Sequence, residues 1–161
     1  MNETDHKHLV RCVDLAEEAL NANNDPFGSV LVAADGRVLF EAKNETSGGD
    51  ETRHPEFDIA RWAAENMTPA DRAKATVYTS GEHCPMCSAA HAWVGLGRIV
   101  YAGSSVQLVE WRKEIDAPPS PVLPLPIQAI APGLSVDGPD LALTERLREL
   151  HRRRAAMRRR D

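Results

Sequence analysis

Residues 79–90 read Thr79-Ser80-Gly81-Glu82-His83-Cys84-Pro85-Met86-Cys87-Ser88-Ala89-Ala90. The β-rich run Thr76–Ser80 predicts a short strand, and Pro85 suits the first turn of a following helix. Gly95 and Gly97 are typical of the end of such a helix. A strand therefore leads into the N-terminus of a helix, and this junction carries a Cys-x-x-Cys pair.

A second segment, His54-Pro55-Glu56, stands at the start of another predicted helix, because Pro55 suits the first helical turn. Cys84 and Cys87 are one helical turn apart, so both thiolates can face one metal ion. A helix N-terminus also favours the ionised form of a thiol.

His54, Cys84 and Cys87 together offer one nitrogen and two sulfur ligands. Three such ligands suit Zn²⁺ and leave one coordination position for water, whose pKa zinc lowers towards about 7. Glu56 can move a proton from that water to a leaving group without binding the metal. The sequence thus predicts one zinc ion per chain, a zinc hydroxide nucleophile and Glu56 as the proton shuttle.

At these residues the chain resembles the zinc-dependent cytidine-deaminase-like superfamily, whose motif is H-x-E followed by P-C-x-x-C. His83 stands where that motif has Pro. Residues 79–90 look like the corresponding stretch of bacterial guanine deaminases and tRNA adenosine deaminases, and the resemblance covers about residues 9–102. It implies a three-layer α/β fold in which helices flank a central five-stranded mixed sheet.

The resemblance also implies contacts with a substrate ring. Asn44 matches the Asn that binds the ring in those families, although Asn and Gly crowd this loop and Asn44 is alternatively a turn residue. Glu82 and His83 are further candidates for substrate contact, and Glu82 alternatively holds loop amides by hydrogen bonds. Phe27 is expected either to stack on the ring or to belong to the core.

In related deaminases the C-terminal region closes the pocket and supplies an acid to the ring. Glu110 and Trp111, in a helix predicted over Ser105–Glu114, are the candidates for substrate binding here. Asp116 is the alternative acid. Both acids are alternatively solvated charges, and Trp111 is alternatively a core residue.

Two other interpretations of the cysteines stay open. A redox Cys-x-x-Cys also follows a strand and opens a helix, but it leaves His54 and Glu56 unexplained. A purely structural zinc would need a fourth protein ligand, for which His83 and His91 are the candidates.

The remaining pattern predicts a single deaminase domain over residues 1–161. Its core covers about 5–115, a Pro-rich segment covers 117–126, and a basic C-terminal helix, frayed at its end, covers about 139–161. The other expected elements are a helix over 9–20, a hairpin of 29–33 and 37–42, a helix over 55–66, a strand over 98–102 and a short edge strand over 127–130.

Composition narrows the class of partner. The chain has 161 residues, 42% hydrophobic and 27% charged, which is typical of one globular domain. No apolar run approaches the ~20 residues of a membrane span, and a secretory signal is not evident, so we expect a cytoplasmic protein without a membrane partner. Residues 144–161 carry eight Arg and three acids, which leaves the rest of the chain at −10 and disfavours nucleic acid as a partner.

The expected function is that of a zinc-dependent aminohydrolase. Its substrate would be a free nucleobase or a related amino-substituted ring of the guanine or other purine, cytosine or s-triazine type. The alternatives are an RNA adenosine deaminase and a non-catalytic, zinc-stabilised binding module. We also expect a homodimer, because small-residue helices favour close packing and the families it resembles assemble at the helices that bear the metal ligands.

Overall fold

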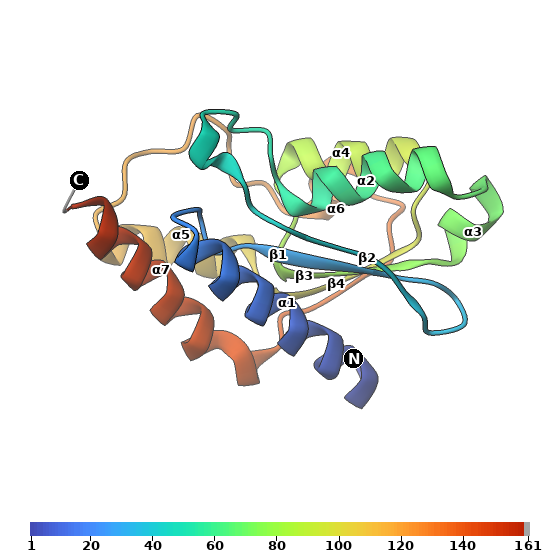
Figure 1. Cartoon of the computed structure of the whole chain (residues 1–161), viewed down its shortest axis with the longest axis horizontal. Coiled ribbons are helices and arrows are strands. Elements are labelled where there is room, and N and C mark those ends of the chain that lie inside the picture. Colours follow the sequence, from blue (N-terminus) through green and yellow to red (C-terminus); the bar gives the residue numbers. More distant parts are fainter. Residues whose placement is uncertain (160–161) are drawn as a thin grey trace.

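A five-stranded mixed sheet forms the centre of the computed structural model, which describes residues 1–159 (Figure 1). The last two residues of the predicted basic tail, 160 and 161, lie outside the described residues. The strands are β1 (Gly28–Val32), β2 (Val38–Lys43), β3 (Thr76–Gly81), β4 (Arg98–Gly103) and β5 (Val136–Asp137). Their order is β2-β1-β3-β4-β5; β1 runs antiparallel to β2 and β3, whereas β3, β4 and β5 are parallel.

Helices cover both faces of the sheet, so the predicted three-layer α/β fold is confirmed (Figure 1). One face carries the helices α1 (Glu3–Asn21), α5 (Ser105–Glu114) and α7 (Thr144–Arg158). The other face carries α2 (Pro55–Asn66), α4 (Pro85–Val94) and the single turn α6 (Ile127–Ile130), with α3 (Pro69–Lys74) following α2. Residues 1–159 also contain two short 3₁₀ turns, Thr46–Gly48 and Leu141–Leu143. No helix in the described part of the chain is long and apolar enough to cross a bilayer.

The core divides between the two faces because side chains alternate along each strand. In β1, Val30 and Val32 belong to the apolar cluster under α1 and α7, whereas Leu31 belongs to the cluster under α2. In β3, Tyr78 belongs to the cluster under α1 and α7, whereas Val77 belongs to the cluster under α2. Both faces of these central strands are therefore buried, and the ends of the strands remain available for a site.

The segment after the Pro-rich residues differs from its prediction. Ile127–Ile130 forms the helical turn α6, and the edge strand of the sheet is instead β5. The backbone amide of Ile127 donates to Glu82 Oε1 at 3.0 Å, and the amide of Ala131 donates to the carbonyl of Ile127, so these groups do not pair with a strand. The last α-helix begins at Thr144 rather than near residue 139.

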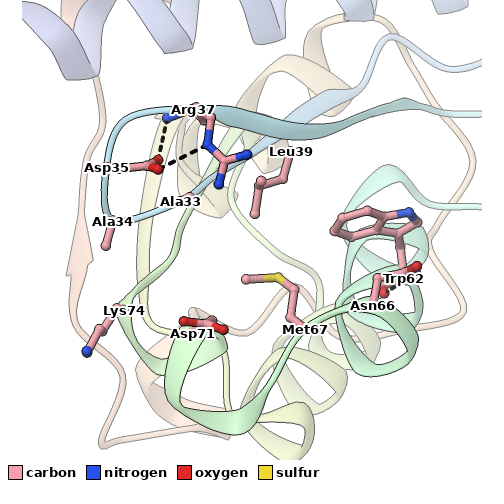
Figure 2. Close-up of a pocket in the computed structure, with 10 residues that line it drawn as sticks. All are labelled: Ala33, Ala34, Asp35, Arg37, Leu39, Trp62, Asn66, Met67, Asp71 and Lys74. Carbon is pink, nitrogen blue, oxygen red and sulfur yellow. Dashed lines mark hydrogen bonds and ion pairs between the residues drawn. The ribbon is translucent and has the colours of Figure 1, made fainter.

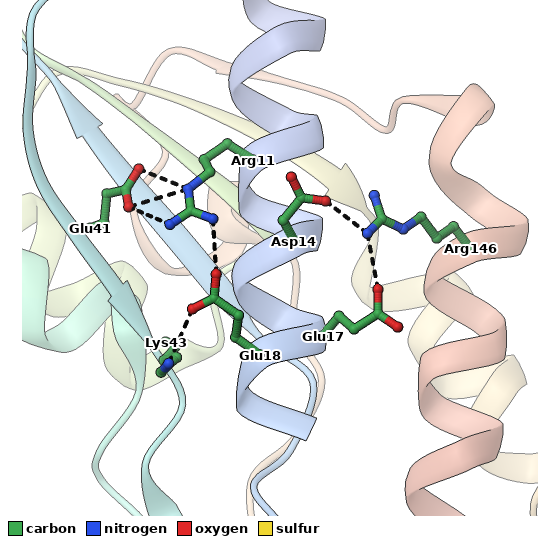
Figure 3. A network of polar contacts seen from close by, with 7 residues as sticks. All are labelled: Arg11, Asp14, Glu17, Glu18, Glu41, Lys43 and Arg146. Carbon is green, nitrogen blue, oxygen red and sulfur yellow. Dashed lines mark hydrogen bonds and ion pairs between the residues drawn. The ribbon is translucent and has the colours of Figure 1, made fainter. Parts of the chain in front are cut away.

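Arginine side chains of α7 pair with acidic residues of other elements. Arg146 contacts Asp14 and Glu17 of α1, and Figure 3 shows how this bridge joins the two helices. Arg148 contacts Glu114 of α5, with an N–O distance of 2.6 Å. Near the end of α7, Arg154 and Arg158 both contact Asp25, so the described end of this helix is held against the rest of the chain and is not frayed.

Candidate active site

The predicted zinc ligands meet where α2 and α4 begin. His54 is the residue before α2, Cys84 is the residue before α4, and Cys87 lies in the first turn of α4. The two Sγ atoms are 3.5 Å apart, and His54 Nδ1 lies 3.7 Å from Cys84 Sγ and 3.6 Å from Cys87 Sγ. A tetrahedral zinc ion with bonds of about 2.3 Å to sulfur and 2.0–2.1 Å to nitrogen would separate these atoms by roughly 3.6–3.8 Å. The three residues therefore lie close enough to bind one metal ion, and they fit zinc.

The pKa values of the two thiols are shifted in opposite directions. The pKa of Cys84 is lowered to about 4, because the Cys87 thiol donates to it and His54 lies beside it. The pKa of Cys87 is raised well above its usual value by the neighbouring Cys84 and by burial. The pair resists carrying two negative charges, and a divalent ion between the sulfurs removes that penalty.

Glu56 lies in the first turn of α2 and is only 5% exposed. Its Oε1 accepts a hydrogen bond from Thr79 Oγ1 at 2.7 Å, and its Oε2 lies 3.8 Å from Cys87 Sγ. Burial raises the pKa of Glu56 above its usual value. One oxygen is thus fixed by the sheet while the other is near the metal ligands, where a carboxylate can exchange protons.

The sheet residues that orient Glu56 were not predicted from the sequence. Ser29 and Thr79 are cross-strand partners of β1 and β3, both are fully buried, and Ser29 Oγ donates to Thr79 Oγ1 at 2.9 Å. A polar residue inside an otherwise apolar strand is the sequence signal that points to such a role, because buried hydroxyls need partners.

Asn44 lies at the end of β2 and is buried. Its Oδ1 accepts from Thr46 Oγ1 at 2.8 Å and from the backbone amides of Thr46 and Asp25, each at 3.3 Å. Its own backbone amide donates to the Phe27 carbonyl. The Oδ1 atom of Asn44 therefore holds the surrounding turn, while its Nδ2 makes no hydrogen bond to the described residues.

A profile of the cytidine and deoxycytidylate deaminase zinc-binding region matches residues 2–103 of the chain. The chain belongs to this family. A probable cytosine deaminase of Schizosaccharomyces pombe is 31% identical over 120 residues, covering 74% of this chain and 73% of that protein. A guanine deaminase of Bacillus subtilis is 35% identical over 119 residues, covering 68% of this chain and 76% of the relative.

The fold of this deaminase is also found among solved structures. A structure in complex with 8-azaguanine has a TM-score of 0.73 at 20% identity and covers 95% of this chain and 85% of its own. Together, the family match and the geometry of His54, Cys84 and Cys87 identify a zinc-binding deaminase that acts on C–N bonds.

Glu82 uses both carboxylate oxygens for backbone amides of this deaminase. Its Oε2 accepts from Ser105 at 2.8 Å, and its Oε1 accepts from Ile127. This arrangement supports the predicted alternative, in which Glu82 holds loop amides. It joins the loop before Cys84 to the starts of α5 and α6.

His83 is buried, and neither ring nitrogen has a hydrogen-bond partner in the described residues. Its ring packs edge-on against His91, whose Nε2 bonds the Gly97 carbonyl. Neither histidine belongs to the group formed by the three metal ligands. The fourth protein ligand that a purely structural zinc would need is therefore not found among the described residues.

The remaining candidates lie around α5. Glu110 is exposed and pairs with Lys113, so the structure does not bring it to the metal ligands. Trp111 is buried, and its ring packs against that of His151. Asp116 follows α5 and lines a cavity of about 150 Å³ with Phe27 and His151, among other residues.

Phe27 packs between the sheet and α7. Its ring would lie 3.0 Å from a Cβ placed on Gly81, and it meets the ring of His151 edge-on at a centroid distance of 5.3 Å. The Phe27 ring is half-buried, so it makes core contacts and also borders a cavity. Its position is therefore compatible with both predicted alternatives, core packing and stacking on a substrate ring.

A larger cavity, of about 350 Å³, lies far along the sheet from the metal ligands. Figure 2 shows Trp62 and Met67 on one side of it and Asp35, bonded to Arg37, on the other. It lies beside the last turns of α2, whereas the metal ligands are at the first turn. None of the predicted site residues lines it.

Proposed function

We propose that this deaminase hydrolyses the exocyclic amino group of a free nucleobase, or of a related amino-substituted nitrogen heterocycle, and releases ammonia. One observation carries the proposal: the buried Glu56 carboxylate is fixed by Thr79 through one oxygen and lies beside the zinc ligands through the other. Guanine, another purine, cytosine and an s-triazine are the candidate rings. The guanine and cytosine deaminases among its relatives support this class.

Zinc in this site would lower the pKa of water towards about 7 and so supply a nucleophile at neutral pH. Glu56 takes one proton from the water and places it on the ring nitrogen next to the carbon that bears the amino group. The water oxygen bonds to that carbon, and Glu56 then carries the second proton from this oxygen to the amino nitrogen, so that the C–N bond breaks, ammonia leaves and a carbonyl remains. A carboxylate whose pKa is raised by burial is suited to both transfers at neutral pH.

Asn44 would hold the ring through its Nδ2. Its Oδ1 is occupied by three donors, so the orientation of the amide is set and the two N–H groups are left for an acceptor on the substrate. An oriented donor of this kind selects a heteroaromatic ring with a nitrogen or carbonyl acceptor.

The charge pattern favours a small ring over RNA. In α7, Arg148 and Arg152 contact Glu114, Arg153 contacts Glu17, and other arginines of this helix are paired in the same way. Arginines that are already paired with carboxylates are poor partners for phosphates. An RNA adenosine deaminase therefore remains the second candidate, and a zinc-stabilised binding module the third.

An ammonia-release screen of the zinc-loaded protein tests the proposal. The panel contains guanine, cytosine, adenine, 8-oxoguanine, their nucleosides, aminotriazines and tRNA. We expect at least one free base or triazine to give a higher kcat/KM than any nucleoside and than tRNA. Release from tRNA alone would support the second candidate, and no release from any compound at full zinc occupancy would support the third.

We also propose that the chain forms a homodimer through the helix that carries the metal ligands. Trp93 on α4 is 87% exposed, which is unusual for so large an apolar side chain. Light scattering at micromolar concentration should give twice the chain mass of 17.7 kDa, and Trp93→Glu should lower the measured mass to that of one chain. A one-chain mass for the unmodified protein would contradict this proposal.

We further propose that the whole chain acts as one deaminase domain. Leu147 and Leu150 of α7, which follow the Pro-rich segment 117–126, belong to the same apolar cluster as Leu9 and Val13 of α1. The two ends of the described chain thus share one core. The cytoplasmic location stays a prediction.

A further inference from the structure

The turn between α1 and β1 is held from one side by the C-terminal helix. Arg154 of α7 donates through Nε to Asp25 Oδ1 at 2.8 Å and through Nη1 to Asn23 Oδ1 at 2.7 Å. Arg158, one helical turn later, donates to the same oxygen of Asp25 at 2.6 Å. Asn23 has a positive φ of 63°, a left-handed conformation that Asn adopts more readily than most residues, and Arg154 bonds its side chain there.

On its other side, this turn makes hydrogen bonds to Asn44. The backbone amide of Asp25 donates to Asn44 Oδ1, and the Phe27 carbonyl accepts from the backbone amide of Asn44. The side chain of Asn24 accepts from the amide of Ser47, just beyond Asn44. Asn44 is therefore bonded to this turn through its backbone amide and through Oδ1, which Thr46 also holds from the other side.

We propose that Arg154 is a positioning residue for the substrate ring: it fixes the turn over residues 23–27 and, through it, the direction of the Asn44 amide. This inference rests on the proposed function, because it requires Asn44 to contact the ring. Arg154 itself touches neither the ring nor the metal ligands in this arrangement. Its effect passes through the backbone of Asp25.

We assign this positioning role to Arg154 and not to Arg158, which contacts the same carboxylate. The side chain of Arg154 is 13% exposed, whereas that of Arg158 is 46% exposed, so water screens the second contact more. The planar guanidinium of Arg154 also reaches Asn23 and Asp25 with two different nitrogens. Such a fork fixes direction as well as distance.

The packing of α7 against Phe27 supports the same role. His151, on the same helix, meets the Phe27 ring edge-on, so α7 contacts both ends of the turn. Burial lowers the pKa of His151 to about 4, so this ring is neutral at pH 7. It therefore adds no positive charge that would compete with Arg154 for Asp25.

The test compares two neighbouring arginines of α7. Arg154→Gln removes the contacts to the turn, whereas Arg153→Gln removes the same charge from contacts to Glu17 and Asn21 of α1. The readouts are KM and kcat for guanine or cytosine, whichever turns over faster, together with zinc content and melting temperature. We expect Arg154→Gln to raise KM about three- to thirtyfold, with kcat within about threefold, because a displaced Asn44 amide loses its hydrogen bond to the ring. Arg153→Gln should leave KM unchanged.

Two further variants separate positioning from general stability. Arg154→Lys keeps a charge for Asp25 but cannot bridge to Asn23, so it should recover part of the KM change. Asp25→Asn keeps the backbone amide that bonds Asn44 and removes only the carboxylate. The double variant Arg154→Gln/Asp25→Asn should have a KM close to that of whichever single variant has the higher KM. Both substitutions break the same Arg154–Asp25 interaction, so their effects should not add.

Asn44→Ala distinguishes failure of this inference from failure of the proposed function. If Asn44→Ala raises KM but Arg154→Gln does not, the inference is overturned and the ring contact stands. If Arg153→Gln raises KM as much as Arg154→Gln, α7 acts only through overall stability, and the inference is again overturned. An unchanged KM in Asn44→Ala overturns both the ring contact and the inference.

Discussion

Replacing Glu56 with Gln should lower kcat by about 10²–10⁴-fold and leave about one zinc ion per chain. The amide of Gln still accepts the hydrogen bond from Thr79 Oγ1, so the shape of the site is kept, but it cannot take up and release protons. Ammonia release and metal analysis of the same preparation provide the two measurements.

Asp58→Asn is the matched control for this experiment. Asp58 is a second carboxylate of α2, two residues after Glu56. Its Oδ2 lies 3.7 Å from Arg53 Nη2, and it is not part of the group formed by the metal ligands. Its kcat should stay within about threefold of the unmodified protein, as is usual for positions outside the reacting groups. Near-normal turnover of Glu56→Gln would exclude the proton-transfer role assigned to Glu56.

Replacing Cys87 with Ala should remove most of the zinc, all detectable turnover and part of the thermal stability. Only one nitrogen and one sulfur ligand would remain, and a site built from three protein ligands loses affinity steeply when one is removed. The chain should still fold, because its two apolar clusters lie along the sheet and do not depend on the metal ligands. Metal analysis after dialysis against a chelator and thermal unfolding measure both effects.

Cys12→Ala is the control for loss of a buried thiol. Cys12 is also fully buried, but it lies on α1 among apolar side chains. We expect this variant to keep its zinc and its turnover, with a small loss of stability from the missing sulfur. Full zinc retention in Cys87→Ala would show that Cys87 is not a ligand.

The parts of the fold that follow local patterns were predictable from the sequence. Pro55 and Pro85 mark helix starts, and β-rich apolar runs bounded by turn residues mark strands of the central sheet. Ile127–Ile130 was not predictable, because its backbone is bonded by Glu82, a residue 45 positions earlier in the chain. A hydrophobic run of four residues fits a strand or a helical turn equally well, and a distant partner decides between them.

The candidate site shows the same division. The metal ligands were predictable, because one His and a Cys-x-x-Cys pair at two helix starts already indicate a zinc site. The proton-transfer role of Glu56 stays a prediction. Ser29 was not predictable, since its link to Glu56 arises from the register of β1 against β3. Glu110 and Trp111 are adjacent in sequence, but successive helical residues point about 100° apart, so one is exposed and the other buried.

The pairing of α1 with α7 has a consequence for synthesis of the protein. During translation the chain emerges from its N-terminus, so the zinc motifs leave the ribosome well before Arg154 does. Until then, the turn at Asp25 lacks its partner, and the apolar face of α1 lacks Leu147 and Leu150. The contacts that hold the turn at residues 23–27 are therefore completed only after the segments with the metal ligands have been synthesised.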